Sequence, residues 1–262
     1  MRNIETAPPS SQAFAFTSRP LTALAAGARF LSNIEDTAQF FRVTDAIDGR
    51  QYENNFQRYI NSPVGSRLNA ERVDFSVVLA DTAYLEAQPA NSLARAYLDF
   101  LNVEDLAMDM LMNAEREAEA ANLNVDETRR IYIRNGIALH DILHIVTGYG
   151  RDPVGEACLL AFTAEQFRLK GVGLIGHGLV LREQARFPRR PILAMAAEAR
   201  RNARAATWIP DIDWRDYFPR PVADARKALG APAPEKYLEH FRGYTAHVAT
   251  RDDDPAPQRQ AA

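Results

Sequence analysis

The chain has 262 residues, of which 47% are hydrophobic and 25% charged, as in a soluble globular protein and unlike a disordered or fibrous one. The net charge of −3 leaves no broad basic face, which makes nucleic acid a poor candidate for the main partner. The single cysteine, Cys158, excludes an intrachain disulfide and suits a reducing compartment. The sequence does not begin with a basic segment followed by an apolar run, so we expect no secretory signal. It also has no uncharged apolar run of the roughly 18 residues that a spanning helix needs, so we expect a cytoplasmic protein. A peripheral contact with the inner face of the cytoplasmic membrane stays open.

The first half of the chain predicts helices joined by short turns. Residues 32–35 form a capping box, Ser-Asn-Ile-Glu, which predicts a helix that ends at Gly49. The pair at 91–92 is expected to open another helix, and a further helix is expected over 104–121. Residues 73–80 have the composition of a strand, but no partner strand is evident.

In the second half, the ends of the predicted helices have clear signals. Asp126 is a good N-cap for a helix that runs to about residue 147, and Gly148 suits the position after its end. Asp152 and Pro153 are typical of a second helix start, and that helix is expected to run to about residue 170 and end at Gly171. Later helices are expected over 178–186, 191–207, 221–229 and 234–248.

These elements predict an all-α fold, a single-domain helical bundle over residues 1–251. The last stretch, 252–262, is polar and contains two prolines, so a flexible tail is expected there.

The residues with the clearest chemical potential lie around the turn at 148–155. His140 and His144 are four residues apart, so both imidazoles lie on one face of the predicted helix and can reach a single metal ion. Glu156 follows twelve residues later, at the start of the next helix. If the two helices pack antiparallel, all three side chains converge at the same end of a helical hairpin. Their nitrogen and oxygen donors suit a metal ion, and two histidines four residues apart on a helix recur in zinc sites.

Asp141 lies between the two histidines and has two alternative roles: a fourth oxygen ligand, or a group that orients a histidine from behind. Gly136, one turn before His140, leaves room for a substrate on that face. A pair of hydrogen-bonded histidines in a polar crevice is the simpler alternative. A zinc hydrolase is disfavoured, because Asp141 stands where the protease motif His-Glu-x-x-His has a longer glutamate.

The run HDILHIVTGYGRDPVGEACLLAFTAEQ, residues 140–166, resembles the coenzyme Q (ubiquinone) biosynthesis protein 4 family, and we expect a bacterial member. The family's hallmark is His-Asp-x-x-His, then eleven residues, then Glu, and this chain has it. Gly148, Gly155 and Gln166 also match, and weaker similarity covers about 50–232. Eukaryotic members often carry Tyr-Arg where this chain has Gly136 and Ile137.

The resemblance implies an all-α fold with a divalent metal, usually taken as zinc, held by His140, Asp141, His144 and Glu156, which would act in catalysis through the metal. It implies a polyprenylated aromatic substrate derived from 4-hydroxybenzoate, whose C1 carboxylate is replaced by hydroxyl. A lyase of this kind is expected. The alternative is a non-catalytic scaffold that binds prenyl lipid and organises other ubiquinone-biosynthesis enzymes. A homodimer stays open.

Several other side chains have two interpretations. Cys158 is expected to be a buried structural thiol rather than a ligand. His177, between two glycines, is expected on a loop from which it could approach a substrate. Arg200, Arg201 and Arg204 are expected to form a solvated face, with anionic lipid or a partner as the alternative. Six phenylalanines could line a groove for a prenyl tail, although ordinary core packing is the simpler interpretation: Phe14, Phe16, Phe40, Phe41, Phe162 and Phe167.

Overall fold

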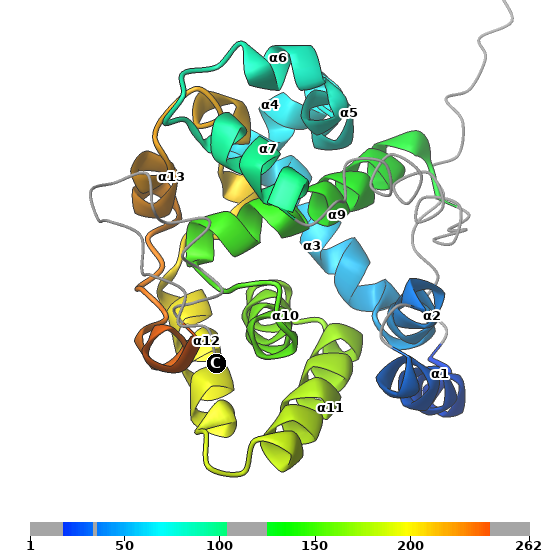
Figure 1. The fold of residues 1–262 in the computed structure, drawn as a ribbon. Coiled ribbons are helices and arrows are strands. Elements are labelled where there is room, and N and C mark those ends of the chain that lie inside the picture. The colour runs from blue at the N-terminus through cyan, green and yellow to red at the C-terminus, as the bar shows by residue number, and fades with distance from the viewer. Residues whose placement is uncertain (1–17, 34–35, 104–124, 242–262) are drawn as a thin grey trace, which may run out of the picture.

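The structure is a computed structural model that describes residues 18–33, 36–103 and 125–241. Within these ranges the regular elements are all helices, and the only strand-like feature is an isolated antiparallel bridge between Ser92 and Pro221 (Figure 1). The predicted all-α fold class is confirmed. None of the helices in the described part of the chain is long and apolar enough to cross a membrane.

The first helices are α1 (Pro20–Ser32), α2 (Thr37–Ile47), α3 (Gly49–Asn61), α4 (Pro63–Ala70), α5 (Phe75–Ala80), α6 (Thr82–Glu86) and α7 (Leu93–Val103). The later ones are α9 (Glu127–Thr147), α10 (Pro153–Phe167), α11 (Lys170–Arg186), α12 (Ile192–Ala205) and α13 (Val222–Leu229), with two 3-10 turns, η1 (Ile209–Asp211) and η2 (Trp214–Asp216). Residues 235–241 are also helical.

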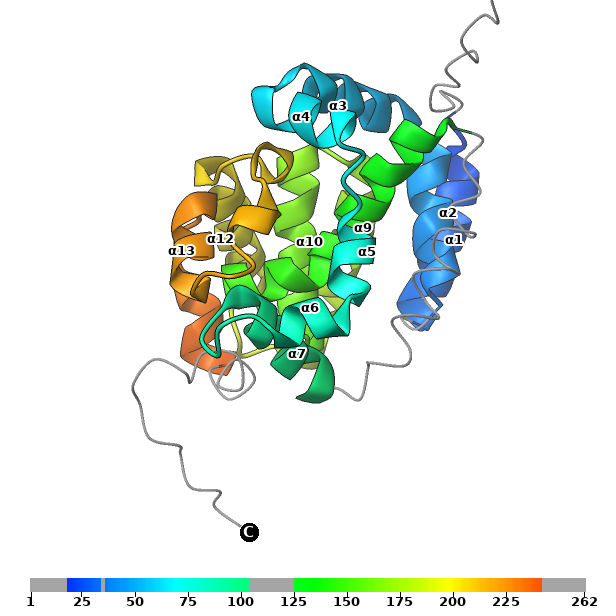
Figure 2. The ribbon, with the colours of Figure 1, turned by 90° about the horizontal axis from the view of Figure 1, so that it is seen from above.

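Helix α10 lies at the centre of the second half. Its apolar side chains point in all directions rather than along one stripe, so much of the helix is buried on every side. Its fully buried members include Ala157, Cys158, Leu159 and Phe162. Helices α11 and α12 flank α10, and α9 crosses above them (Figure 1). Of the remaining helices, α1 and α2 pack on α11, and α5, α7 and α13 pack on α9. Figure 2 shows α1 and α2 side by side, on the opposite side of the molecule from α12 and α13.

Most helix ends in the second half are confirmed. The Asp126 carboxylate accepts the backbone N–H of Arg129 at 2.9 Å, which makes it the N-cap of α9. Gly148 ends α9 in the left-handed conformation, at φ 83°, which glycine adopts without steric cost. Asp152 caps α10 by accepting the N–H groups of Val154 and Gly155.

The capping-box prediction at 32–35 is wrong. Ser32 is the last residue of α1, and its hydroxyl donates to the carbonyl of Ala28, one turn back in the same helix. The next helix, α2, begins at Thr37 instead. The predicted end of this helix is close to the observed one, because α2 ends at Ile47 and Asp48 is its C-cap. Gly49 is then the first residue of the next helix, α3.

The strand-like segment at 73–80 is helical from Phe75 onward. The Asp74 carboxylate accepts the N–H of Ser76 at 3.1 Å and so caps the short helix α5. The side chain of Asn135 on α9 holds the entry to this helix, accepting the N–H of Phe75 and donating to the carbonyl of Val73. A helix cap and a tertiary anchor thus outweigh the strand composition of the segment.

The predicted end of α10 near residue 170 is also wrong. The helix ends at Phe167, and Arg168 takes up the left-handed conformation at φ 54°. Gly171 lies inside α11, where its backbone N–H donates to the buried carboxylate of Asp48 at 2.9–3.0 Å. A Cβ at this position would lie 2.5 Å from an Asp48 oxygen and 3.1 Å from the Cα of Thr44, so the glycine allows α11 to approach Asp48 closely rather than ending a helix. His177 therefore lies on α11 and not on a loop.

Some predictions fall outside the described residues: the helix at 104–121, Phe14 and Phe16, and the tail at 252–262. Of the other phenylalanines, Phe162 is fully buried in the core, and Phe40 and Phe167 pack partly buried against it. For these three, core packing is the better interpretation.

Candidate metal centre

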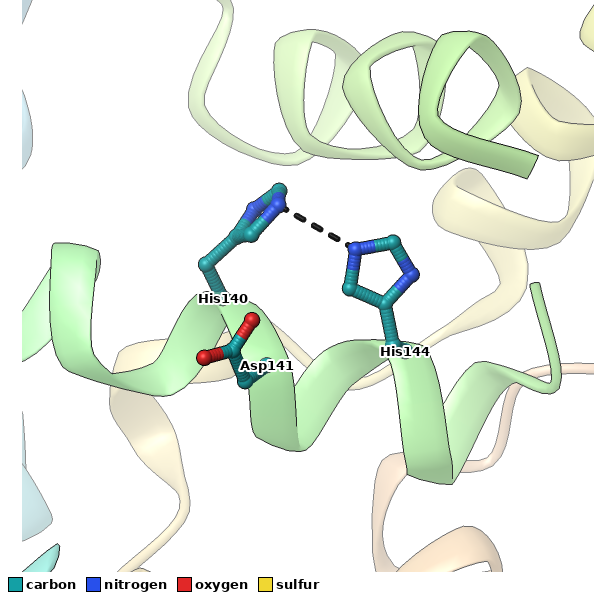
Figure 3. A group of neighbouring side chains, drawn as sticks. All are labelled: His140, Asp141 and His144. Atoms are coloured by element: carbon teal, nitrogen blue, oxygen red, sulfur yellow. Dashed lines mark hydrogen bonds between the residues drawn. The ribbon is translucent and has the colours of Figure 1, made fainter. Parts of the chain in front are cut away.

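The two histidines of α9 project to the same side of the helix, one turn apart (Figure 3). The imidazole nitrogens His140 Nε2 and His144 Nε2 lie 3.2 Å from each other, with the rings nearly perpendicular. The spacing in the sequence predicted this shared face, and the helix places both nitrogens where one ion can reach them.

Glu156 in the first turn of α10 completes the cluster. One carboxylate oxygen, Oε1, lies 3.3 Å from His140 Nε2, and the other, Oε2, lies 3.1 Å from His144 Nε2. In Figure 1, α10 is seen nearly end-on while α9 runs across the view, so the helices are inclined rather than paired along their lengths. The three side chains meet because the end of α9 and the start of α10 adjoin at the turn.

These separations fit a small divalent metal. With zinc–nitrogen and zinc–oxygen bonds of about 2.0–2.1 Å, two ligand atoms of a tetrahedral site lie about 3.3 Å apart. The distances of 3.1–3.3 Å between the three donor groups match that edge. The donor set of two imidazoles and a carboxylate is also one that zinc prefers.

A hydrogen bond fixes the position of one ring proton of His144. Its Nδ1–H donates to the backbone carbonyl of Tyr149 at 2.9 Å, because a carbonyl can only accept. In the neutral ring, Nε2 then carries a lone pair, and this lone pair faces an oxygen of Glu156 that is also an acceptor. Two facing acceptors need a cation or a proton between them. The backbone carbonyl is the kind of outer contact that orients a metal-binding histidine.

The surroundings of the cluster are closed on one side and open on the other. The His144 side chain is 1% exposed and stacks on Phe100, with ring centroids 5.8 Å apart. The side chains of His140 and Glu156 are 33% and 31% exposed. A metal held here would therefore keep one face that a small molecule can reach, as catalytic zinc sites do and structural ones do not.

Glu156 and His140 shift each other's pKa values. Burial acts to raise the pKa of Glu156, but His140 and His144 outweigh it and hold that pKa well below its usual range. Burial acts to lower the pKa of His140, but the charge and hydrogen bond of Glu156 raise it to about 9. The site thus keeps a negative carboxylate facing the imidazoles and attracts positive charge.

The turn between α9 and α10 is held by contacts that the sequence did not reveal. The Tyr237 hydroxyl accepts the N–H of Gly150 at 3.0 Å and donates to the carboxylate of Asp152. At Gly155, an added Cβ would lie 2.0 Å from the carbonyl oxygen of Gly150, so only glycine fits where α10 meets the turn. Tyr237 is 85 residues from Asp152 in the sequence, so no local pattern could have indicated this contact.

Asp141 is half-buried beside the pair. His140, Asp141 and His144 each offer one ligand atom, and these atoms all lie within 4.8 Å of one another. The negative charge of Asp141 contributes to the raised pKa values of His140 and Tyr97. Both roles foreseen for it, fourth ligand and orienting group, are compatible with this position.

The other candidate side chains lie away from the cluster. Cys158 is fully buried, and burial raises the pKa of its thiol, as expected for a structural cysteine. Gly136 is exposed on α9, and a Cβ there would meet nothing within 4 Å, so the surface beside His140 is open. Gln166 links α10 to its neighbours, donating to the carbonyl of Ala203 and accepting the N–H of Ile209.

Comparisons with known proteins agree on one family. Residues 13–235 match the family model described as Coenzyme Q (ubiquinone) biosynthesis protein Coq4. The mitochondrial ubiquinone biosynthesis protein COQ4 homolog of Rattus norvegicus is 27% identical over 184 residues, which cover 68% of this chain and 64% of that protein. The mitochondrial COQ4 protein of Podospora anserina is 24% identical over 207 residues, which cover 78% of this chain and 62% of that protein. The chain thus spans less than two thirds of the length of these relatives.

A solved structure shares the fold. The crystal structure of a proposed ubiquinone biosynthesis protein from Nostoc punctiforme, at 2.85 Å resolution, superposes with a TM-score of 0.55 at 18% sequence identity. The match covers 82% of this chain and 99% of that one. Since the family model matches most of the chain, the protein belongs to the Coenzyme Q (ubiquinone) biosynthesis protein Coq4 family.

Proposed function

We propose that the chain acts in ubiquinone biosynthesis as a metal-dependent enzyme. The observation that carries the proposal is the convergence of His140, His144 and Glu156, with donor atoms 3.1–3.3 Å apart and one face exposed. These three residues would hold a divalent ion, zinc by preference, and Asp141 would serve as a fourth ligand or orient His140. The assignment to ubiquinone biosynthesis rests on the family and on the names of the relatives.

The proposed reaction replaces the C1 carboxylate of a polyprenylated, 4-hydroxybenzoate-derived ring by hydroxyl. The bond between the ring and the carboxyl carbon breaks, carbon dioxide leaves, and an external two-electron oxidant supplies the oxygen atom of the new hydroxyl. A divalent ion supplies a Lewis acid that stabilises negative charge on the substrate oxygens.

Residues around the cluster suit an anionic aromatic substrate. Arg151, exposed in the turn, has its guanidinium 5.5 Å from the centre of the Phe100 ring, on which His144 stacks. Its positive charge acts on His140, so it lies near enough to attract a carboxylate to the site. Gly136 leaves the neighbouring face of α9 without a side chain, which gives a ring and its tail room to approach.

The test is complementation of a strain that lacks its own copy of the gene, with ubiquinone and its precursors measured by mass spectrometry. Glu156→Gln keeps the shape of the side chain but removes the charge of the ligand. Glu127→Gln is the matched control, because Glu127 is an exposed carboxylate at the other end of α9. We expect the control to restore ubiquinone, and Glu156→Gln to accumulate a carboxylated polyprenyl precursor.

Circular dichroism and elemental analysis of both purified variants complete the design. Full rescue by a folded Glu156→Gln protein that contains no metal would overturn the catalytic proposal and favour the scaffold. Precursor accumulation with a folded, metal-poor variant supports it.

A further inference from the structure

A hollow in the surface lies at the other end of α10, away from the metal centre. It has a volume of about 230 Å³ and lies between the last turns of α10, the first half of α11, and α12. Part of its lining consists of residues with small side chains or none, which leave the space unfilled: Ala161, Ala164 and Gly173. Glu156 and Ala164 are eight residues apart on α10, or about 12 Å along the helix at 1.5 Å per residue. The hollow is therefore separate from the candidate metal centre.

The lining of this hollow is strongly cationic. Arg168, Lys170 and Arg200 all line it, and none of them has an ion-pair partner within 4.0 Å in the part of the chain that the structure describes. The single acidic side chain in the lining, Glu165, already pairs with Arg204 outside it, at 2.7 Å. The hollow thus concentrates positive charge, although the chain as a whole is slightly negative.

One of these cations is held in place by a histidine. The ring of His177 donates through Nδ1–H to the carbonyl of Gly173 at 2.6 Å, one turn back on α11. Its Nε2 is then an acceptor, and the guanidinium of Arg200 donates to it at 2.7 Å. Arg200 therefore reaches from α12 across to α11 and keeps its other N–H groups for a ligand.

Another cation, Arg168, lies in the short connection between α10 and α11, where the backbone is strained. Arg168 takes up the left-handed conformation at φ 54°, where glycine or asparagine is usual and a long side chain has a cost. The backbone N–H of Gly171 at the start of α11 is already bound by Asp48, so the corner does not present it to a ligand. What an anion would meet here are the side chains of Arg168, Lys170 and Arg200.

We propose that this hollow binds a phosphate monoester. Its volume lies below the roughly 300–1,000 Å³ of sites for drug-sized molecules, so it suits a small anionic group rather than a whole ligand. Two guanidinium groups and an ammonium group carry three positive charges, enough to neutralise the two negative charges of a phosphate dianion, and a guanidinium can bind two phosphate oxygens at once. The phosphate comes either from a soluble ester or from the headgroup of a lipid such as phosphatidic acid.

The test for the soluble source is calorimetric titration of the purified full chain with inorganic phosphate and with glycerol 3-phosphate. We expect saturable binding that Arg200→Gln weakens about tenfold or more, because it removes charged hydrogen bonds. Arg201→Gln is the matched control: Arg201 is the next residue on α12, exposed and outside the lining, and its loss should leave binding unchanged.

A second variant separates a binding role from a structural one. Arg168→Gly removes a cation but relieves the left-handed backbone, so the protein should be at least as stable while phosphate binding weakens. Vesicle flotation tests the lipid source: phosphatidylcholine vesicles with phosphatidic acid are compared with vesicles that carry phosphatidylserine, which lacks a monoester.

Binding of a soluble phosphate or of phosphatidic acid vesicles supports the proposal if it depends on Arg168 and Arg200. Calorimetric binding identifies a soluble ester as the ligand, and flotation identifies a lipid headgroup. The proposal is overturned if neither source binds. It is equally overturned if Arg201→Gln weakens binding as much as Arg200→Gln. Binding would then depend on general surface charge and not on the residues that line the hollow. Phosphate could also bind at the metal centre, but Arg168 and Arg200 line only the hollow. Binding that is lost in the Arg168 and Arg200 variants therefore reports on this hollow, and its failure can be told apart from failure of the proposed function.

Discussion

Replacing each of two glycines with alanine, on either side of the metal centre, should change stability in opposite directions. In Gly155→Ala, the new Cβ would lie 2.0 Å from the carbonyl oxygen of Gly150 and 2.7–2.8 Å from two further backbone atoms of that residue. No flexible side chain can yield there, so the backbone must shift. Overpacking of this kind costs roughly 1–3 kcal/mol and occasionally more, and contact with backbone places this case at the upper end, about 3 kcal/mol.

Gly136→Ala is the matched control on α9. Its Cβ would meet nothing within 4 Å, so the change brings only the better helix propensity of alanine. We expect a gain of about 0.5–1 kcal/mol in the free energy of unfolding.

The assay is urea unfolding followed by circular dichroism, with linear extrapolation to water. Because Gly155 directly precedes Glu156, the shifted backbone should also move the carboxylate away from the histidines and reduce the metal content of the purified protein. If Gly155→Ala unfolds at the same urea concentration as the wild type, the close contact between α10 and the turn is not as described. A loss of stability in Gly136→Ala would contradict the open surface beside His140.

Three further predictions concern the surroundings of the site. Tyr237→Phe should lower the free energy of unfolding by about 1–3 kcal/mol, because the N–H of Gly150 and the carboxylate of Asp152 both lose a buried partner; an unchanged urea midpoint would contradict this. In chelator-treated protein, the raised pKa of His140, about 9, contributes stability that is fully present below about pH 6.5 and is lost as the pH rises through about 9. His140→Gln should flatten that decline in urea unfolding measured across this pH window, and an identical pH profile would refute the charge pairing. Cys158, fully buried and with a raised pKa, should react with a thiol reagent only after the protein unfolds, so rapid labelling of the native protein would show that α10 is not buried.

Sequence reasoning succeeded where the signal depends on neighbouring backbone. Asp126, Gly148 and Asp152 act on N–H and carbonyl groups within four residues, so their roles can be read locally. It failed where a distant partner decides. Gly171 looked like a helix end, but it lies inside α11, where its N–H bonds to Asp48, 123 residues away, and its lack of a side chain allows the close approach. The error at Ser32 has a local cause instead: its hydroxyl donates to the carbonyl of Ala28, four residues back, and residue type alone does not distinguish this bond from a helix cap.

The candidate site divides in the same way. Helix periodicity places His140 and His144 on one face, and the short turn brings Glu156 near them. The antiparallel packing on which this prediction depended is not found, because α9 and α10 are inclined and meet only at the turn. The Phe100 ring against His144 belongs to α7, more than forty residues earlier, and had no sequence signal. The backbone carbonyl of Tyr149, which fixes the ring of His144, could not be identified from residue types at all.

X-ray absorption spectroscopy of the zinc-loaded protein tests the metal centre most directly. The account predicts nitrogen and oxygen neighbours at about 2.0–2.1 Å, with the scattering pattern of two imidazoles, one of which disappears in His144→Ala. A sulfur neighbour at about 2.3 Å would instead mean that Cys158 binds the ion, and would contradict the account. So would a zinc spectrum that His144→Ala leaves unchanged.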